Sequence, residues 1–353
     1  MIKSFIGGRV LPLLPMLVGM LLAPSLAWSA ESSAQEQAQR QITQPLNNAP
    51  MWREVRKGEN PYQTSQVRGV ETNILVQPAG ETWRRIRNGP LTLYSGILLV
   101  AIPLLIFGYY RWKGPLKLHD KPSGRFIERF NDWERIVHWA TAISFVILAI
   151  SGLIILFGKY VILPLFGYTL FSWLAIIGKN LHNFVGPLFV ICTLAMFVIF
   201  VRDNIGRVID FQWIAKAGGM FSGAHVPSGR FNFGEKAWFW FGVILLGIIV
   251  SASGLVLDFP NFEQTRGVMQ WWNVVHAIAA VLFIAMSLGH IYMGTLGVEG
   301  AYESMRYGFV DEAWAKEHHE IWYQEVKAGN ARQRFVDEVP ADIKTQMAQA
   351  IKA

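Results

Sequence analysis

Long apolar runs separated by short polar segments dominate this chain. A run of about 20 apolar residues is long enough to cross the hydrocarbon layer of a membrane as an α-helix. The pattern predicts five such helices in the mature chain, at about 90–110, 134–157, 181–201, 236–257 and 271–298. We therefore expect an all-α membrane protein in which the last four helices form a bundle (134–300) and the first, at 90–110, is an extra N-terminal transmembrane helix.

The two ends of the chain differ from this pattern. Residues 1–30 have the features of a signal peptide, with Lys3 and Arg9 before an apolar stretch and small residues up to Ala30. An uncleaved first helix is the alternative. Residues 31–89 are polar and are expected to be translocated and loosely ordered until they meet a partner. The polar tail, 301–353, is expected to be mostly helical.

Basic residues give the expected orientation. The segment 111–133 and its flanks carry seven of them: Arg111, Lys113, Lys117, Lys121, Arg125, Arg129 and Arg135. Short loops rich in Lys and Arg stay in the cytoplasm. Alternation from this loop places residues 31–89 in the periplasm and the tail in the cytoplasm, in a bacterial inner membrane.

The apolar segment 160–177 is ambiguous, because it contains Pro164 and Gly167 and lies between two lysines. If it crossed the membrane, His138 and His182 would lie on the same side. We interpret it as an interfacial or re-entrant hairpin on the periplasmic side.

Composition narrows the function. The 353 residues are 52% hydrophobic and 16% charged, against about 25% charged in soluble domains. The net charge of +7 lies largely in loops, so it does not indicate nucleic-acid binding. The single cysteine, Cys192, excludes an intrachain disulfide, a cysteine-ligated iron–sulfur cluster and a covalent haem attachment.

Four histidines lie in predicted spans. His276 and His290 are 14 positions apart, which on a helix is a rise of about 21 Å and about 40° short of four turns. They share one face near opposite ends of a span, so each needs a partner from elsewhere. Alternating topology pairs His276 with His182 near the periplasm and His290 with His138 near the cytoplasm.

Paired neutral imidazoles in apolar surroundings indicate haem. Two histidines fill both axial positions of haem iron, and such a site carries electrons rather than binding dioxygen. Two b haems in one bilayer would form an electron path. A histidine-relay, proton-coupled transporter is the competing class, but it would more naturally include buried carboxylates, and the span centres have none.

Two further patterns bear on the sites. The sequence 149–153 resembles 251–255, since each has a Ser-Gly pair late in a span; glycine there favours close approach of a flat ligand or simply of another helix. The remaining histidines are expected at surfaces or interfaces: His119, His225, His318 and His319.

The chain resembles the γ subunit of respiratory formate dehydrogenase, a di-haem b-type cytochrome, over about residues 125–330. The motifs that carry the resemblance are Arg135-Ile136-Val137-His138-Trp139, Leu181-His182-Asn183-Phe184-Val185-Gly186, the loop 230–236, the His276/His290 spacing, and 314–319 with Trp322-Tyr323. It implies the same histidine pairs. It also implies a quinone site near His290, with Asn232 and Gly234 at the head group. Asn232 and Glu235 also match a capping box, and one residue could do both.

The resemblance further implies a division of labour. Formate oxidation would belong to a molybdenum- or tungsten-containing α subunit, and an iron–sulfur β subunit would pass electrons to this chain, which would reduce quinone and hold no catalytic residue of its own. The cytochrome b of a hydrogenase or of another molybdoenzyme is the alternative within this class. A purely structural membrane anchor is a third possibility.

Overall fold

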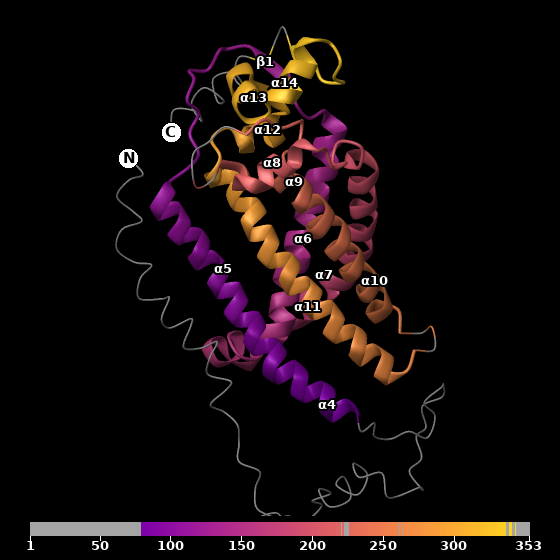
Figure 1. Cartoon of the computed structure of the whole chain (residues 1–353). Coiled ribbons are helices and arrows are strands. Elements are labelled where there is room, and N and C mark those ends of the chain that lie inside the picture. The colour runs from indigo at the N-terminus through magenta and orange to yellow at the C-terminus, as the bar shows by residue number, and fades with distance from the viewer. Residues whose placement is uncertain are drawn as a thin grey trace, which may run out of the picture. The chain divides into compact units, whose positions relative to one another are not determined.

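The computed structural model describes residues 79–219, 221, 226–260, 262, 264–336, 339–340 and 343 (Figure 1). The predicted signal peptide, residues 31–78 and His225 lie outside these residues. The described chain forms two compact units. The first contains residues up to Val100, with Ile150–Asn183 and Ala252–Val281; the second contains Ala101–Ala149, Phe184–Ser251 and Leu282 onward.

Among the residues that the structure describes, five helical stretches are long and apolar enough to cross a membrane, which agrees with the five spans predicted for the mature chain. Their elements are α4 (Ala79–Ile86), η2 (Arg87–Leu91) and α5 (Thr92–Lys113); α6 (Asp132–Phe157); α7 (Ile162–Phe200); α9 (Phe233–Ala237), η4 (Trp238–Leu246) and α10 (Gly247–Asp258); and α11 (Arg266–Tyr292) with η5 (Met293–Gly297). The protein is a multi-pass membrane protein.

The segment 160–177, predicted to be an interfacial or re-entrant hairpin, is not a separate element, and its position relative to the membrane stays a prediction. Helix α7 runs through most of this segment into the span that carries His182, with one non-helical residue at Gly167, where φ is 79°. Glycine adopts this conformation without the clash that a Cβ would cause. Two helical pieces therefore meet at a kink at Gly167, and residues 168–177 are continuous with the helix that carries His182.

The first span begins earlier than the predicted residue 90. Residues 79–86 are helical although polar, because Glu81 pairs with Arg84 and Arg85 at helical spacing. Within the first unit, the indole nitrogen of Trp83 donates to the side chain of Asn273 at 3.3 Å. The extra N-terminal segment thus packs beside the start of α11.

The second unit contains a small sheet that the sequence pattern did not predict. Strand β1 (Phe126–Glu128) pairs antiparallel with β2 (Phe309–Asp311) on one side and with β3 (Phe335–Val336) on the other. Runs of two or three residues are too short to give a period-2 signal. The sheet joins the segment before α6 to the C-terminal tail.

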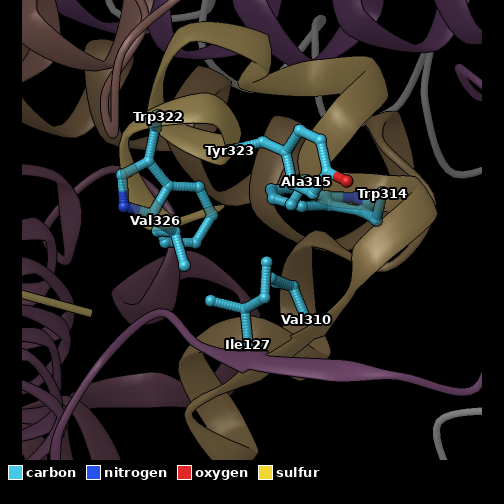
Figure 2. Packing of buried hydrophobic residues seen from close by; sticks show 7 residues of the cluster. All are labelled: Ile127, Val310, Trp314, Ala315, Trp322, Tyr323 and Val326. Atoms are coloured by element: carbon cyan, nitrogen blue, oxygen red, sulfur yellow. The ribbon is translucent and has the colours of Figure 1, made fainter. Parts of the chain in front are cut away.

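The remaining elements of the second unit are short helices: α8 (Ile209–Ala215), η3 (Ala217–Gly219), α12 (Ala301–Tyr307), α13 (Glu312–His318) and α14 (Glu320–Lys327). Helices α13 and α14 pack on the sheet through a buried cluster (Figure 2). Its members are Ile127, Val310, Trp314, Ala315, Trp322, Tyr323 and Val326. This core fixes the tail against the segment that leads into α6.

Candidate functional site

His182 on α7 and His276 on α11, here called the first pair, face each other within the first unit. Their ring centroids are 5.9 Å apart, with 75° between the ring planes. Both side chains are partly buried. The structure therefore brings together the two histidines that span topology had paired.

Each ring of the first pair is held by a Ser-Gly pair from the preceding span. The Nδ1 atom of His182 lies 2.9 Å from Oγ of Ser151, and Nδ1 of His276 lies 2.9 Å from Oγ of Ser253. Both serines are buried. The similarity between 149–153 and 251–255 predicted a close approach at these residues. It did not predict the contact with the histidines, because that contact depends on which way each helix is rotated about its axis.

His138 on α6 and His290 on α11, the second pair, lie together in the second unit. Their ring centroids are 6.3 Å apart, with 57° between the planes. The indole of Trp238 stacks on His290, with centroids 4.8 Å apart and 12° between the planes. Nδ1 of His138 is buried and makes no hydrogen bond to the residues that the structure describes.

The spacing of each pair is compatible with one metal ion held between the two imidazoles. If a nitrogen of each ring lay about 2 Å from such an ion, on opposite sides of it, the two ring centroids would be about 6 Å apart. The observed separations of 5.9 and 6.3 Å match this spacing. Rotation of either ring about the common axis leaves the bonds intact, so the interplanar angles of 57° and 75° are compatible with it.

Asn232 is the N-cap of α9. Its side chain accepts a hydrogen bond from the backbone nitrogen of Glu235 at 3.0 Å, and the Glu235 carboxylate accepts one from the backbone nitrogen of Asn232 at 2.8 Å. This is the predicted capping box. Gly234 lies against Trp213, because a Cβ at Gly234 would meet the indole at 3.0 Å. The loop is thus tightly built, and contact with quinone stays a prediction.

A buried polar cluster supports this loop from outside the spans. Arg129 donates to the Glu235 carboxylate at 2.9 Å and to Nε2 of His319 at 3.0 Å. His319 donates from Nδ1 to the carbonyl of Gly229 at 2.8 Å. Burial, and then the charge of Arg129, hold the pKa of His319 well below its ordinary value. His319 is therefore neutral at pH 7.

The expectation that His319 lies at a surface or interface is wrong, since it is 2% exposed. A second buried arginine, Arg230, pairs with both carboxylate oxygens of Glu134 at 3.0 and 2.8 Å. It also donates to Asp203 and to the carbonyl of Arg129. Composition alone could not identify these contacts, because they join stretches up to 190 residues apart.

A family model for prokaryotic cytochrome b561 matches residues 129–308 of the chain, 180 of its 353 residues. The chain belongs to this family. The matched region of the cytochrome contains all four histidines of the two pairs, together with Asn232 and Gly234. It leaves out the first span and most of the C-terminal tail.

Individual relatives of the cytochrome are formate dehydrogenase subunits. It is 33% identical over 210 residues to the cytochrome b556(fdo) subunit of formate dehydrogenase from Escherichia coli K12, covering 57% of this chain and 93% of the relative. It is 29% identical over 221 residues to the nitrate-inducible cytochrome b556(Fdn) subunit of that strain, covering 60% and 96%. The formate dehydrogenase cytochrome b556 subunit of Haemophilus influenzae is 26% identical over 202 residues, covering 54% and 79%.

Proposed function

We propose that this chain is the membrane-anchoring cytochrome b subunit of a formate dehydrogenase, which carries electrons from an iron–sulfur subunit through two b haems to quinone. The observation that carries the proposal is the presence of two histidine pairs at bis-imidazole spacing in a cytochrome b561 family member. The relatives, which are formate dehydrogenase subunits, support the choice of complex.

The histidines would hold the haems. His182 and His276 would ligate one, and His138 and His290 the other; each bound haem supplies a one-electron carrier. With two imidazoles as its protein ligands, each bound haem would have no iron position left for a substrate and would serve only to transfer electrons. The protein's work at these sites is to fix ring orientation and to exclude water.

The basic segment before α6 supports the orientation in the membrane. By the positive-inside rule it lies in the cytoplasm, so the first pair lies toward the periplasm and the second toward the cytoplasm. Electrons would enter at the first pair from the iron–sulfur β subunit, which receives them from a molybdenum- or tungsten-containing α subunit. The membrane is then a bacterial inner membrane.

Quinone would bind near the second pair. Oδ1 of Asn232 accepts the capping hydrogen bond, while its amide nitrogen makes no hydrogen bond to the residues that the structure describes and can donate to a quinone carbonyl. The helix that Asn232 caps continues into η4, whose Trp238 stacks on His290. Reduction of quinone to quinol takes two electrons and two protons, and the protons would come from the cytoplasm.

Haem stoichiometry in the detergent-purified full chain tests the proposal. We expect two non-covalent b haems in a reduced-minus-oxidised spectrum, and His276→Ala should lose the haem of the first pair and keep the other. Retention of both haems in that variant contradicts the pairing.

A well-folded chain without haem, made with adequate haem supply, favours the proton-relay transporter. Intact electron transfer after loss of His182 or His290 favours a structural anchor.

The complex and the quinone site need separate tests. In membranes, formate should reduce the haems; reduction by hydrogen instead indicates a hydrogenase partner. In the assembled complex, Asn232→Ala should slow quinone reduction while haem content persists. Asn232→Asp is the matched control, because it keeps the capping oxygen and removes the amide donor. If Asn232→Asp reduces quinone normally, Asn232 serves as a cap and not as a quinone contact.

A further inference from the structure

The two Ser-Gly pairs occupy equivalent places beside the two rings of the first pair. Ser151 and Gly152 lie on α6 and meet His182 on the next span, α7. Ser253 and Gly254 lie on α10 and meet His276 on the next span, α11. Both Oγ–Nδ1 distances are 2.9 Å. Each imidazole of the first pair therefore has the same contact with a serine of the preceding span.

The contact between Nδ1 and the serine Oγ leaves Nε2 of each ring available for a metal, because a hydroxyl oxygen can accept the proton of Nδ1. A neutral imidazole carries its proton on one nitrogen and presents the other as a lone pair. When the proton on Nδ1 is donated to a serine Oγ, Nε2 is the nitrogen that can ligate. Hydrogen bonds of this kind fix the tautomer and ring orientation of metal-bound histidines and raise their basicity.

The glycine after each serine also contacts the histidine ring. A Cβ at Gly152 would lie 3.4 Å from Cε1 of His182, and a Cβ at Gly254 would lie 3.3 Å from Cε1 of His276. Each ring edge thus rests directly on helix backbone beside the hydroxyl that holds it. A larger residue would push the ring away from that hydrogen bond.

The second pair has a different environment. Nδ1 of His138 is buried without a hydrogen-bond partner among the described residues. His290 lies flat against the indole of Trp238. A ligand whose Nδ1–H is not engaged is a weaker electron donor than one whose Nδ1–H is hydrogen-bonded. The two sites therefore offer iron unequal donor strength.

We infer that Ser151 and Ser253 are positioning residues that orient His182 and His276 and make the haem of the first pair the lower-potential haem of the two. The inference rests on the haem ligation proposed above. More basic imidazoles favour ferric over ferrous iron, so reduction becomes harder. An electron that enters at the first pair would then move downhill to the second pair, toward the quinone side.

A potentiometric titration of the purified, haem-loaded full chain tests this inference, with Ser151→Ala, Ser253→Ala and the double variant. His276→Ala identifies which midpoint belongs to the first pair. We expect the lower midpoint to rise in each serine variant and the higher one to stay unchanged. A tenfold loss of preference for ferric iron raises a one-electron midpoint by 59 mV. Haem loss from the first pair should also become faster, since such partners typically contribute about 10- to 100-fold to metal affinity.

Two controls separate the hydroxyl from packing. Ser151→Thr and Ser253→Thr keep a hydroxyl and should keep the wild-type midpoint. Ser287→Ala removes a buried serine of α11 that bonds the carbonyl of Phe283 on the same helix, and it should move neither midpoint.

The outcomes also separate this inference from the proposed function. Two haems with unchanged midpoints in the alanine variants overturn the inference and leave the haem sites intact. A wild-type chain without haem overturns the proposed function itself. If an alanine variant loses its haem, the threonine variant decides, because loss there too shows that the hydroxyl is not the cause.

Discussion

Arg230 lies at the centre of the buried polar cluster, and Arg230→Met removes its charge. The guanidinium bonds both oxygens of Glu134 at 3.0 and 2.8 Å and also contacts Asp203. Arg230 and Glu134 are 6% and 5% exposed, so water cannot replace the lost contacts. Methionine has a comparable length and no charge, so the substitution isolates the ion pair from the packing.

Removal of one partner from a buried ion pair costs about 3–5 kcal/mol, because the other charge is left uncompensated. Asp203 keeps Arg332 at 2.7 Å, and Glu134 keeps the backbone nitrogen of Asn131 at 3.0 Å. We therefore expect the lower end, a loss of about 3 kcal/mol in the free energy of unfolding. With an unfolding entropy of about 2.1 cal/mol/K per residue, this loss in a chain of 353 residues corresponds to a fall in Tm of about 4 °C.

Heat unfolding of the detergent-solubilised protein, followed by tryptophan fluorescence, measures this fall. Arg332→Met is the control, because Arg332 pairs with the same Asp203 but its side chain is 62% exposed. An exposed pair contributes about 0–1 kcal/mol. The double variant Glu134→Gln/Arg230→Met should recover part of the loss, since it removes the stranded charge. A Tm for Arg230→Met equal to that of Arg332→Met would refute the reasoning.

Two further predictions concern the loop that Asn232 caps. Below pH 6.5, the ordinary pKa of histidine, the unfolded chain protonates His319 and the folded chain does not, so stability should fall with falling pH by up to about 1.4 kcal/mol per pH unit. His319→Gln should flatten Tm against pH between about 6.5 and 5, and an unchanged slope contradicts the depressed pKa. Gly234→Ala brings a Cβ to 3.0 Å from Trp213 and should cost about 1–3 kcal/mol, read as a lower Tm. Gly108→Ala, where nothing lies within 4 Å, should not lower Tm, and equal losses in the two variants would show that the Trp213 contact is not the cause.

The spans and the histidine pairing could be predicted because both depend on properties that are local or alternate along the chain. The length of an apolar run identifies a span, and the number of spans between two histidines decides whether they lie on the same side of the membrane. The break within 160–177 could be predicted, but its form could not, because the helix resumes directly after a single glycine, Gly167. Proline and glycine residues indicate that a helix is interrupted, but they do not indicate whether the interruption is a one-residue kink or a longer hairpin.

The supporting contacts could not be predicted because they depend on the rotation of helices and on partners distant in sequence. The link from Ser151 to His182 requires two helix faces to be aligned. His319 was assigned to a surface because its neighbours are polar, whereas its burial depends on Arg129, 190 residues away. Strand β1 was missed because its partners are strands of three and two residues.

The contact between Arg129 and His319 has a consequence for biogenesis. The Asn232 turn is supported by Glu235, which Arg129 holds, and Arg129 is held in turn by a residue near the end of the chain. Since synthesis proceeds from the N-terminus, every span is made before His319 is available. The Asn232 turn therefore reaches its final conformation only after translation is nearly complete. A chain truncated before His319 would insert its helices, but Arg129 would lack its contact with His319 and the turn beside the second pair would lack this support.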